Sequence, residues 1–422
     1  MLSRRLSLRA LKADVVESKS FGSVRSFIVY LGPALIVSMA YMDPGNYGTD
    51  LIAGSNYKYE LIWAVWMASI MAMILQYLSG KLGIASGKSL AELVKESLGR
   101  RSLVLSYWIS AELAAAATDL AEYLGTVIAL NILFGVPMLY AAIFGALDVL
   151  LIMTLMNKKF HLIEQFFILS VSIIAVGFLF EAIMTRPSIT QIIVHTFSPT
   201  VSASTIPLVV GIIGATVMPH ALFVHSWLTR NKLTSTAIEE KRRLRKLHRN
   251  ETIVLLSIAA VVNVGILLVA IPLKPNPDLT IGQAYQQLGL AFGAVTGVVF
   301  IVTLLMSGLA SSTTGTIAGQ AIMEDLLGKR VNPWVRRVVT RFVNVFPTTI
   351  AILLKFDPLK LLVYSQIILS IMIPLPMIPL IYYTSKKKFM GEFTNRRITI
   401  VVASIIAAMI VGFNAYLILT SV

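Results

Sequence analysis

Long apolar runs decide what this chain can fold into. Segments of low charge recur between residues 27 and 420, and about 20 apolar residues let an α-helix cross a bilayer. Of the 422 residues, 56% are hydrophobic and 14% charged, whereas soluble domains are about 45–50% apolar and about 25% charged. The runs are continuous rather than alternating, which argues against a β-barrel. The sequence therefore predicts an all-α polytopic membrane protein.

Several classes of protein are excluded by residues that the sequence lacks. It contains no cysteine, which rules out a disulfide-stapled domain, a Cys-ligated metal and a cysteine nucleophile. It also has no HExxH motif, no phosphate-binding loop and no recognisable nucleophile–base pair. We therefore expect a protein that is not an enzyme and needs no resident cofactor.

Apolar runs bounded by charge, Gly and Pro predict eleven transmembrane helices, the first and sixth of them interrupted. We expect residues 1–422 to form a single transmembrane domain, with residues 1–26 as a charged arm rather than a signal peptide. The predicted spans are 27–54, 61–82, 103–132, 137–156, 162–184, 205–229, 251–272, 287–323, 335–354, 360–384 and 397–420.

Basic residues predict the orientation of the helices. With the N-terminus inside, 30 of the 36 Lys and Arg residues fall on the cytoplasmic side of these spans, as the positive-inside rule requires. The C-terminus is then external. The net charge of +15 is explained by topology, so we expect a lipid bilayer and no nucleic acid as partner. The basic segment 239–249 is predicted to form a short helix on the cytoplasmic surface.

Two predicted spans contain residues that break a helix. The first holds Asp43-Pro44-Gly45-Asn46, and the sixth holds Ala215-Thr216-Val217-Met218-Pro219-His220. Proline removes a backbone donor, and unwound backbone survives at membrane depth only inside protein or beside a water-filled cavity. One such break is usually a simple kink. Two breaks in corresponding places favour a substrate site instead.

The spacing of the breaks predicts an internal repeat. Five spans begin with each break, which gives two inverted repeats of five helices at 27–184 and 205–384, plus an accessory helix at 397–420. Transporters of this kind bind substrate where their discontinuous helices meet.

The residues at the breaks suit a divalent cation. Asp43 is a carboxylate at bilayer depth with no Lys or Arg in its span, and such a charge needs a partner. Asn46 adds an amide oxygen, and the unwound backbone near Ala40 and Ala215 adds carbonyl oxygens. Oxygen ligands alone would suit Mg²⁺ or Ca²⁺.

Met218 shifts this preference, because a thioether is a soft ligand that favours Mn²⁺, Fe²⁺, Co²⁺ or Cd²⁺. Core packing is the alternative for Met218. Gln366, in the tenth span, is a further candidate ligand, and Gln76 and Asn263 are weaker ones. Each of these three could instead form a hydrogen bond between helices.

Three carboxylates in the third span suggest a proton route. Glu112, Asp119 and Glu122 are separated by seven and three residues, so successive side chains lie within about 20° and about 60° of each other on a helix. Such chains of acids mark proton pathways in transporters. The alternative is a structural cluster with Arg341, the only basic residue that we place deep in a span. His220 is a candidate proton acceptor, or a hydrogen-bonding wall residue.

Together these motifs resemble the Nramp family of proton-coupled divalent metal transporters over about residues 28 to 385. The matching segments are the two helix breaks, 117–122 in the third span, 311–320 in the eighth, and 333–337. The resemblance implies a LeuT-type fold in the cell membrane.

The resemblance also implies roles for single residues. Asp43, Asn46, Met218 and the Ala215 carbonyl would hold the metal, joined in an occluded state by the Ala40 carbonyl and Gln366. His220, Glu122 and Asp119 would carry protons, with Arg341 as their salt-bridge partner.

We therefore expect a monomeric importer of Mn²⁺ or a similar ion, with protons moving along. One alternative is a sodium-coupled symporter of an organic substrate, against which Asp43 counts because it would repel an anionic group. A Mg²⁺ transporter or a channel is the other alternative, against which Met218 counts.

Overall fold

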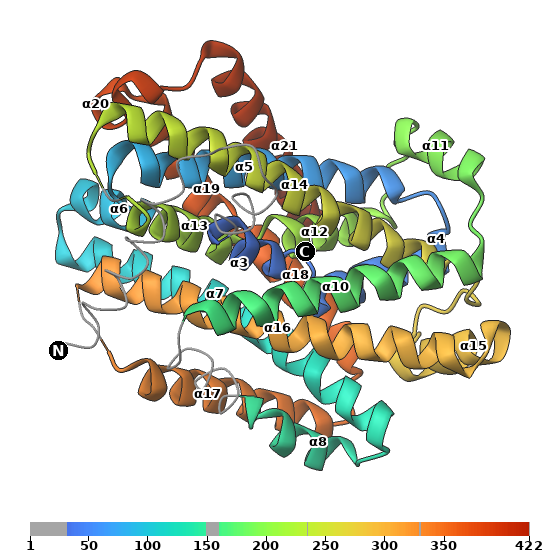
Figure 1. Cartoon of the computed structure of the whole chain (residues 1–422). Coiled ribbons are helices and arrows are strands. Elements are labelled where there is room, and N and C mark those ends of the chain that lie inside the picture. Colours follow the sequence, from blue (N-terminus) through green and yellow to red (C-terminus); the bar gives the residue numbers. More distant parts are fainter. Residues whose placement is uncertain (1–31, 149–159, 234, 329–330, 422) are drawn as a thin grey trace.

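The computed structural model describes residues 32–148, 160–233, 235–328 and 331–421, and these ranges are helical apart from their connections (Figure 1). The predicted arm 1–26, the first residues of span 27–54 and residues 149–156 of span 137–156 lie outside them. The helices are α3 Pro33–Ala40, α4 Pro44–Tyr57, α5 Ile62–Ser86, α6 Leu90–Leu98, α7 Arg101–Phe134, α8 Met138–Gly145, α10 Phe160–Thr185, α11 Ile189–Phe197, α12 Ile206–Val217, α13 Pro219–Asn231, α14 Ile238–Ala270, α15 Ile281–Phe292, α16 Ala294–Leu327, α17 Pro333–Leu353, α18 Pro358–Met372, α19 Pro374–Ser385, α20 Lys387–Met390 and α21 Arg397–Ser421.

Among the described residues, eight helical segments are long and apolar enough to cross a membrane. They are Ile62–Ser86, Arg101–Phe134, Gln165–Thr185, Ile206–Asn231, Ile238–Ala270, Ala294–Leu327, Pro358–Ser385 and Arg397–Thr420. The other three predicted spans coincide with the α3–α4 pair, with α8, and with α17, which carries three arginines. The all-helical membrane architecture is thus confirmed.

Both predicted breaks are present, and each begins a new helix at its proline. Chain segments Tyr41 to Asp43 separate α3 from α4, and Met218 alone separates α12 from α13. Both pairs lie in the middle of the bundle and are almost entirely buried. Around them, α7 packs along α16, α13 along α5, α12 along α18, and α14 against both α4 and α5.

Two predicted boundaries are wrong. The basic segment 239–249 is not a separate surface helix, because α14 continues from it into the apolar span without a break; no Gly or Pro interrupts the helix before Gly265. Predicted span 287–323 is divided by Gly293, whose φ of 95° ends α15 before α16 starts. The tenth predicted span, 360–384, agrees with the candidate span Pro358–Ser385, in which α18 and α19 meet at Ile373, directly before Pro374.

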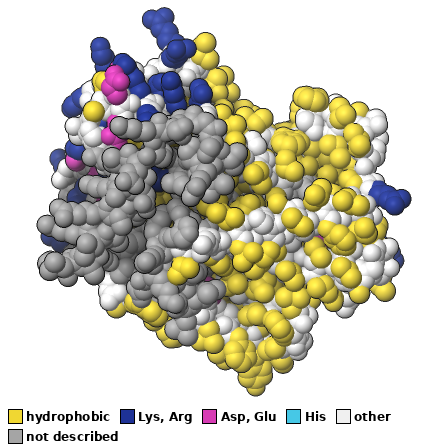
Figure 2. Space-filling model, viewed as in Figure 1, with side chains coloured by type: hydrophobic (Ala, Val, Ile, Leu, Met, Phe, Trp, Pro, Cys, Tyr) yellow, Lys and Arg dark blue, Asp and Glu magenta, His cyan; other side chains and the backbone are white. Residues whose placement is uncertain are grey.

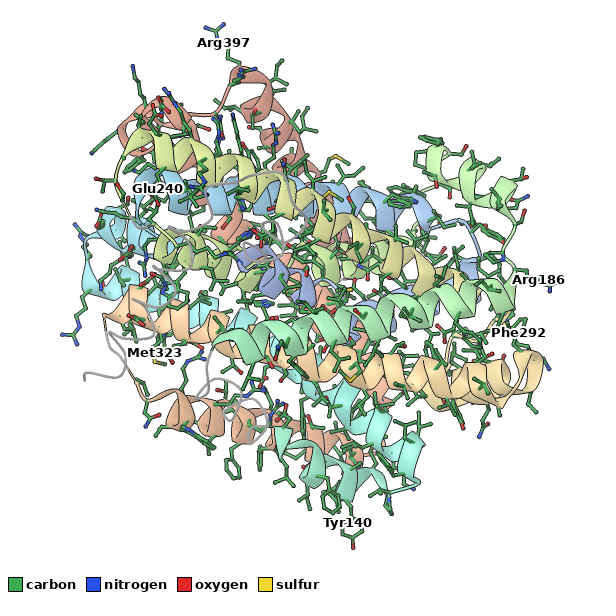
Figure 3. All side chains as sticks on the ribbon, viewed as in Figure 1. Tyr140, Arg186, Glu240, Phe292, Met323 and Arg397 are labelled. Carbon is green, nitrogen blue, oxygen red and sulfur yellow. The ribbon has the colours of Figure 1, made fainter. Side chains whose placement is uncertain are left out.

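Charged and hydrophobic side chains occupy different parts of the molecular surface. Figure 2 shows Lys and Arg side chains gathered at the end where α6 and α20 lie, and hydrophobic side chains over much of the remaining visible surface. In Figure 3, Glu240 and Met323 lie towards this end, whereas Arg186 and Phe292 lie at the opposite one. Lys81 of α5 and Arg336 and Arg337 of α17 are exceptions, because these three basic side chains are buried.

Candidate metal site

The first helix break is organised by Asp43, which forms the N-cap of α4. Its Oδ1 accepts hydrogen bonds from the Asn46 backbone nitrogen at 3.0 Å and from Asn46 Nδ2 at 2.8 Å, the usual role of Asp at a helix start. Its Oδ2 is buried and has no hydrogen-bond partner among the described residues. One carboxylate oxygen is therefore held by the protein, and the other is left for a ligand.

The second break is made by Met218, which is fully buried. Its backbone has φ 36° and ψ 107°, a conformation that side chains other than glycine rarely adopt. Residues in such sparsely populated regions cost about 1–3 kcal/mol each and cluster at functional sites. Met218 therefore carries a conformational strain energy in its backbone. A residue that served only to fill the core would not need this strained conformation.

Prolines free two backbone carbonyls at these breaks. In an α-helix the carbonyl of residue i accepts from the N–H of residue i+4. For Ala40 that residue is Pro44 and for Ala215 it is Pro219, and proline has no N–H. Both alanines are fully buried. Their carbonyl oxygens thus lack the helical partner that an ordinary sequence would provide.

The two breaks meet each other and α18. The Thr216 hydroxyl donates to Asn46 Oδ1 at 3.3 Å, which joins α12 to the start of α4. A Cβ at Gly45 would lie 2.2 Å from Gln366 Nε2, and one at Gly214 would lie 1.8 Å from the Gln366 carbonyl oxygen. These two glycines let α4 and α12 approach α18 closely, and Gln366 Oε1 is buried without a partner in the described chain.

The two weaker candidates, Gln76 and Asn263, form hydrogen bonds with Tyr41 at the first break, and Asn263 Oδ1 is buried without a partner in the described ranges. Asn263 Nδ2 donates to the Tyr41 carbonyl at 3.0 Å. Gln76 Nε2 donates to the Tyr41 hydroxyl at 2.6 Å, and its Oε1 pairs with His225 Nδ1 at 2.8 Å. Both amides therefore form the hydrogen bonds between helices that were the alternative to a ligand role.

The candidate proton acceptors lie beside this region. His220 Nδ1 pairs with the Thr118 hydroxyl of α7 at 3.1 Å, and its Nε2 is buried and unpartnered within the described ranges. Glu122 is fully buried, and neither carboxylate oxygen has a hydrogen-bond partner there. Gly315 of α16 faces it, since a Cβ at that glycine would lie 2.8 Å from Glu122 Oε2.

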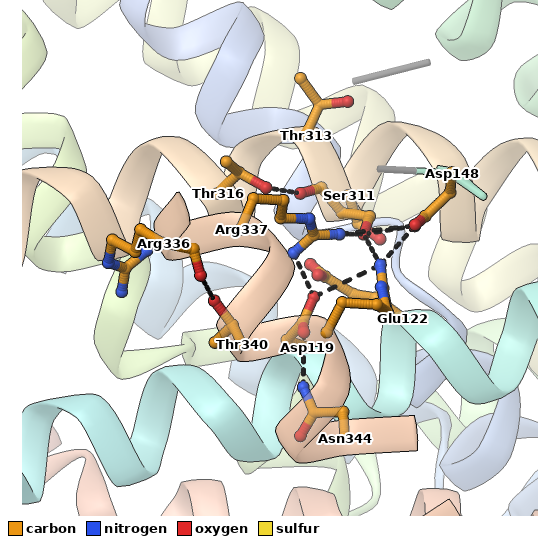
Figure 4. Close-up of polar contacts among 12 residues, drawn as sticks. Asp119, Glu122, Asp148, Ser311, Thr313, Thr316, Arg336, Arg337, Thr340 and Asn344 are labelled. Atoms are coloured by element: carbon orange, nitrogen blue, oxygen red, sulfur yellow. Dashed lines mark hydrogen bonds and ion pairs between the residues drawn. The ribbon is translucent and has the colours of Figure 1, made fainter. Parts of the chain in front are cut away.

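The salt-bridge cluster differs from the prediction, which gave Arg341 to the third-span acids. Arg337 is the closer partner of Asp119, at 2.5 Å against 3.6 Å for Arg341. Arg341 therefore keeps a salt bridge with Asp119 but pairs more closely with Asp148, which Arg337 also reaches at 3.4 Å. Figure 4 shows the contacts of Arg337 with Asp119 and Asp148, together with the hydrogen bond from Asn344 to Asp119.

Two members of this cluster were missed. Arg337, within the predicted span 335–354, was not among the predicted site residues although it lies one helical turn before Arg341, a spacing that puts both on the same face. Asp148, three residues after the end of α8, follows an apolar stretch with no motif around it. Glu112 does not join the cluster, because it pairs with Arg336 at 2.8 Å. Arg341 is thus not the only basic residue deep in a span.

Comparison with known proteins decides the family. The family model described as natural resistance-associated macrophage protein-like, Nramp, matches residues 34–420. The chain belongs to the Nramp family. The Nramp resemblance found in the sequence motifs is thus confirmed, and this Nramp chain is a multi-pass protein of the cell membrane in a family of transporters rather than enzymes.

Curated relatives and solved structures extend this result. The chain is 39% identical over 400 residues to the divalent metal cation transporter MntH of Deinococcus radiodurans, covering 93% of this chain and 90% of the relative. It is 33% identical over 425 residues to the MntH of Bacillus subtilis, covering 99% of both. A structure of a variant of the Eremococcus coleocola manganese transporter matches with a TM-score of 0.85 at 30% identity, over 94% of this chain and 87% of the other.

A more distant structural match concerns the fold alone. The structure of MhsT in complex with L-phenylalanine has a TM-score of 0.61 at 13% identity, over 90% of this Nramp chain and 98% of the other. The two chains share the LeuT-type arrangement of helices.

Proposed function

We propose that this protein imports divalent transition-metal ions, Mn²⁺ above all and also Fe²⁺, Co²⁺ and Cd²⁺, together with protons, by alternating access between broken helices. The observation that carries the proposal is the buried Asp43 carboxylate with one unpartnered oxygen, at a break joined by Asn46 and Thr216 to the break that contains Met218. The manganese transporter in the structural comparison and the MntH relatives support it.

In this proposal the metal ligands are Asp43 Oδ2, Asn46 Oδ1, the Met218 sulfur and the Ala215 carbonyl. The Ala40 carbonyl and Gln366 Oε1 join them when the site is occluded. Hard oxygens satisfy the charge of the ion, and the thioether favours a transition metal over Mg²⁺ and Ca²⁺. No three His, Cys, Asp or Glu side chains cluster like metal ligands in the described ranges. A ligand set with one carboxylate, an amide, a thioether and carbonyls agrees with this finding.

Protons follow a separate route in the proposal. Glu122 and His220 accept them beside the metal site, and Asp119 with its arginines leads towards the cytoplasm. The buried, unpartnered carboxylate of Glu122 supports this assignment, because a buried acid without a partner is favoured in its neutral, proton-bearing form.

We infer eleven spans in two inverted repeats, 27–184 and 205–384, with α21 as the accessory helix. The N-terminus is cytoplasmic and the C-terminus external. Amphipathic connecting helices support the inversion: α6 lies at the end rich in Lys and Arg, and α15 lies at the opposite end (Figure 1). They precede the third helix of the first and of the second repeat, respectively.

Uptake into proteoliposomes tests the function. We expect Mn²⁺ to enter and to acidify the lumen, with little uptake of Mg²⁺ or Ca²⁺ at the same concentrations. Empty liposomes and the Asp43→Ala variant are the controls. Uptake of Mg²⁺ as fast as of Mn²⁺ would support a general divalent transporter instead, and Mn²⁺ entry without acidification would remove the proton coupling.

A further inference from the structure

The salt-bridge cluster next to Glu122, counted together with Glu122, contains more carboxylates than basic groups. Arg337 and Arg341 are its cations, with side chains only 2% and 3% exposed. Asp119 and Asp148 are paired with them, and Ser312 donates to Asp148 at 3.2 Å. Glu122 lies beside Asp119 and Arg337 (Figure 4) but forms no hydrogen bond with the described residues.

Charge balance then determines how many protons this cluster holds. Arginine stays protonated in proteins, so the two guanidinium groups balance two carboxylates. A third ionised carboxylate would leave a net negative charge buried in the bundle, which is costly. The two aspartates are stabilised as anions by their ion pairs, and Glu122 has none. One proton therefore resides on Glu122.

We propose that Asp148 determines this proton count by neutralising Arg341. The inference rests on the proposed function, in which metal binding and proton movement are coupled. Without the Asp148 charge, two arginines would face only Asp119 and Glu122. The cluster would then be neutral with Glu122 ionised, so no proton would be held there. Asp148 acts through Arg341 and touches neither the metal nor the moving proton, which makes it a positioning residue.

The other charged groups around Glu122 agree with a proton that leaves when metal binds. They come from several helices and are Asp119 on α7, Asp43 at the start of α4, Arg337 and Arg341 on α17, and, through the arginines, Asp148 after α8. A divalent ion at Asp43 favours the ionised form of a nearby carboxyl. The Glu122 carboxyl then ionises and releases its proton to water.

Isothermal titration calorimetry of the purified full-length protein tests this count. Titrating Mn²⁺ in buffers of different ionisation enthalpy measures the protons released per metal ion bound. We expect Asp148→Asn to release about one proton fewer than the wild type, with the metal affinity changed by less than tenfold. In proteoliposomes the same variant should carry Mn²⁺ with little acidification.

The double variant Asp148→Asn with Arg341→Gln distinguishes charge balance from structure. It leaves one arginine with two carboxylates, so one proton is again needed for neutrality. We expect it to regain the released proton that Asp148→Asn loses. A purely structural role of Asp148 would not be rescued by removing a second member of the cluster. Asp148→Glu, which keeps the charge, should match the wild type.

The outcomes separate the two proposals. Absence of Mn²⁺ binding by the wild type would overturn the proposed function itself. Binding with the same proton release in wild type and Asp148→Asn would overturn only the role of Asp148. Both variants must bind Mn²⁺ and elute from size exclusion like the wild type. If proton release is then lost in Asp148→Asn and is not recovered in the double variant, the role of Asp148 is also overturned.

Discussion

Met218 has a strained backbone, and in the proposed site its sulfur would provide selectivity as a soft ligand atom. Mg²⁺ and Ca²⁺ compete well for a site built only of oxygens, and they gain little from a thioether that occupies the place of a water or carbonyl ligand. Met218→Ala makes room for a water molecule. We expect a modest loss of Mn²⁺ transport, a larger loss for Cd²⁺, and new uptake of Mg²⁺ or Ca²⁺ in a proteoliposome panel. Unchanged discrimination against Ca²⁺ would make Met218 a packing residue.

Asp43 supplies the only carboxylate at the two breaks. Neutral dipoles alone replace the hydration shell of a divalent ion poorly. We therefore expect Asp43→Ala to abolish Mn²⁺ binding measured by calorimetry. Asn56→Ala, at the far end of the same helix α4, is a matched control and should bind normally. Near-native affinity of the Asp43 variant would exclude this residue from the site.

The N-terminus of helix α3 binds a carboxylate from another helix. Glu251 of α14 accepts hydrogen bonds from the backbone nitrogens of Gly32 at 2.7 Å and Ala34 at 3.2 Å. An anion at a helix N-terminus also interacts favourably with the helix dipole. In the proposed alternating access the half-helices would shift, and this contact would stabilise the state in which α3 packs against α14.

Removing the Glu251 contact should release α3. Because the chain has no cysteine, Met39→Cys introduces a single thiol on a fully buried position of α3. We expect Glu251→Ala to speed maleimide labelling of this thiol by about tenfold or more, since hydrogen bonds to charged groups contribute about 1.5–3 kcal/mol. Glu251→Gln, which keeps a neutral acceptor, should have a smaller effect. Equal labelling rates in all three backgrounds would show that Glu251 does not hold α3.

The rate of Mn²⁺ uptake by the whole transporter should depend on the membrane potential. One elementary charge moved through 100 mV corresponds to about 2.3 kcal/mol, so a divalent ion gains about 4.6 kcal/mol before any proton is counted. We expect an inside-negative potential, set by a potassium gradient with valinomycin, to accelerate Mn²⁺ uptake. Uptake independent of voltage across the same range would indicate electroneutral exchange.

Features that depend on local chemistry were predictable from the sequence. Long apolar runs specify helices in a bilayer because the backbone must satisfy its own hydrogen bonds there. Pro44 and Pro219 end the preceding helices because proline lacks an N–H, and that same property frees the carbonyls of Ala40 and Ala215. The breaks, the membrane architecture and the family were therefore correctly predicted.

Features that depend on contacts between distant segments were decided only by tertiary packing. Arg337 and Asp119 are 218 positions apart, and Arg337 and Asp148 are 189 apart. No local pattern indicates which arginine faces which acid, because this depends on how α17 lies against α7 and on where the chain continues after α8. Likewise, Gln366 comes close to both breaks because Gly45 and Gly214 present no side chain to α18. Helix ends follow from covalent chemistry along the chain, whereas partners across the bundle follow from the close approach of helices in space.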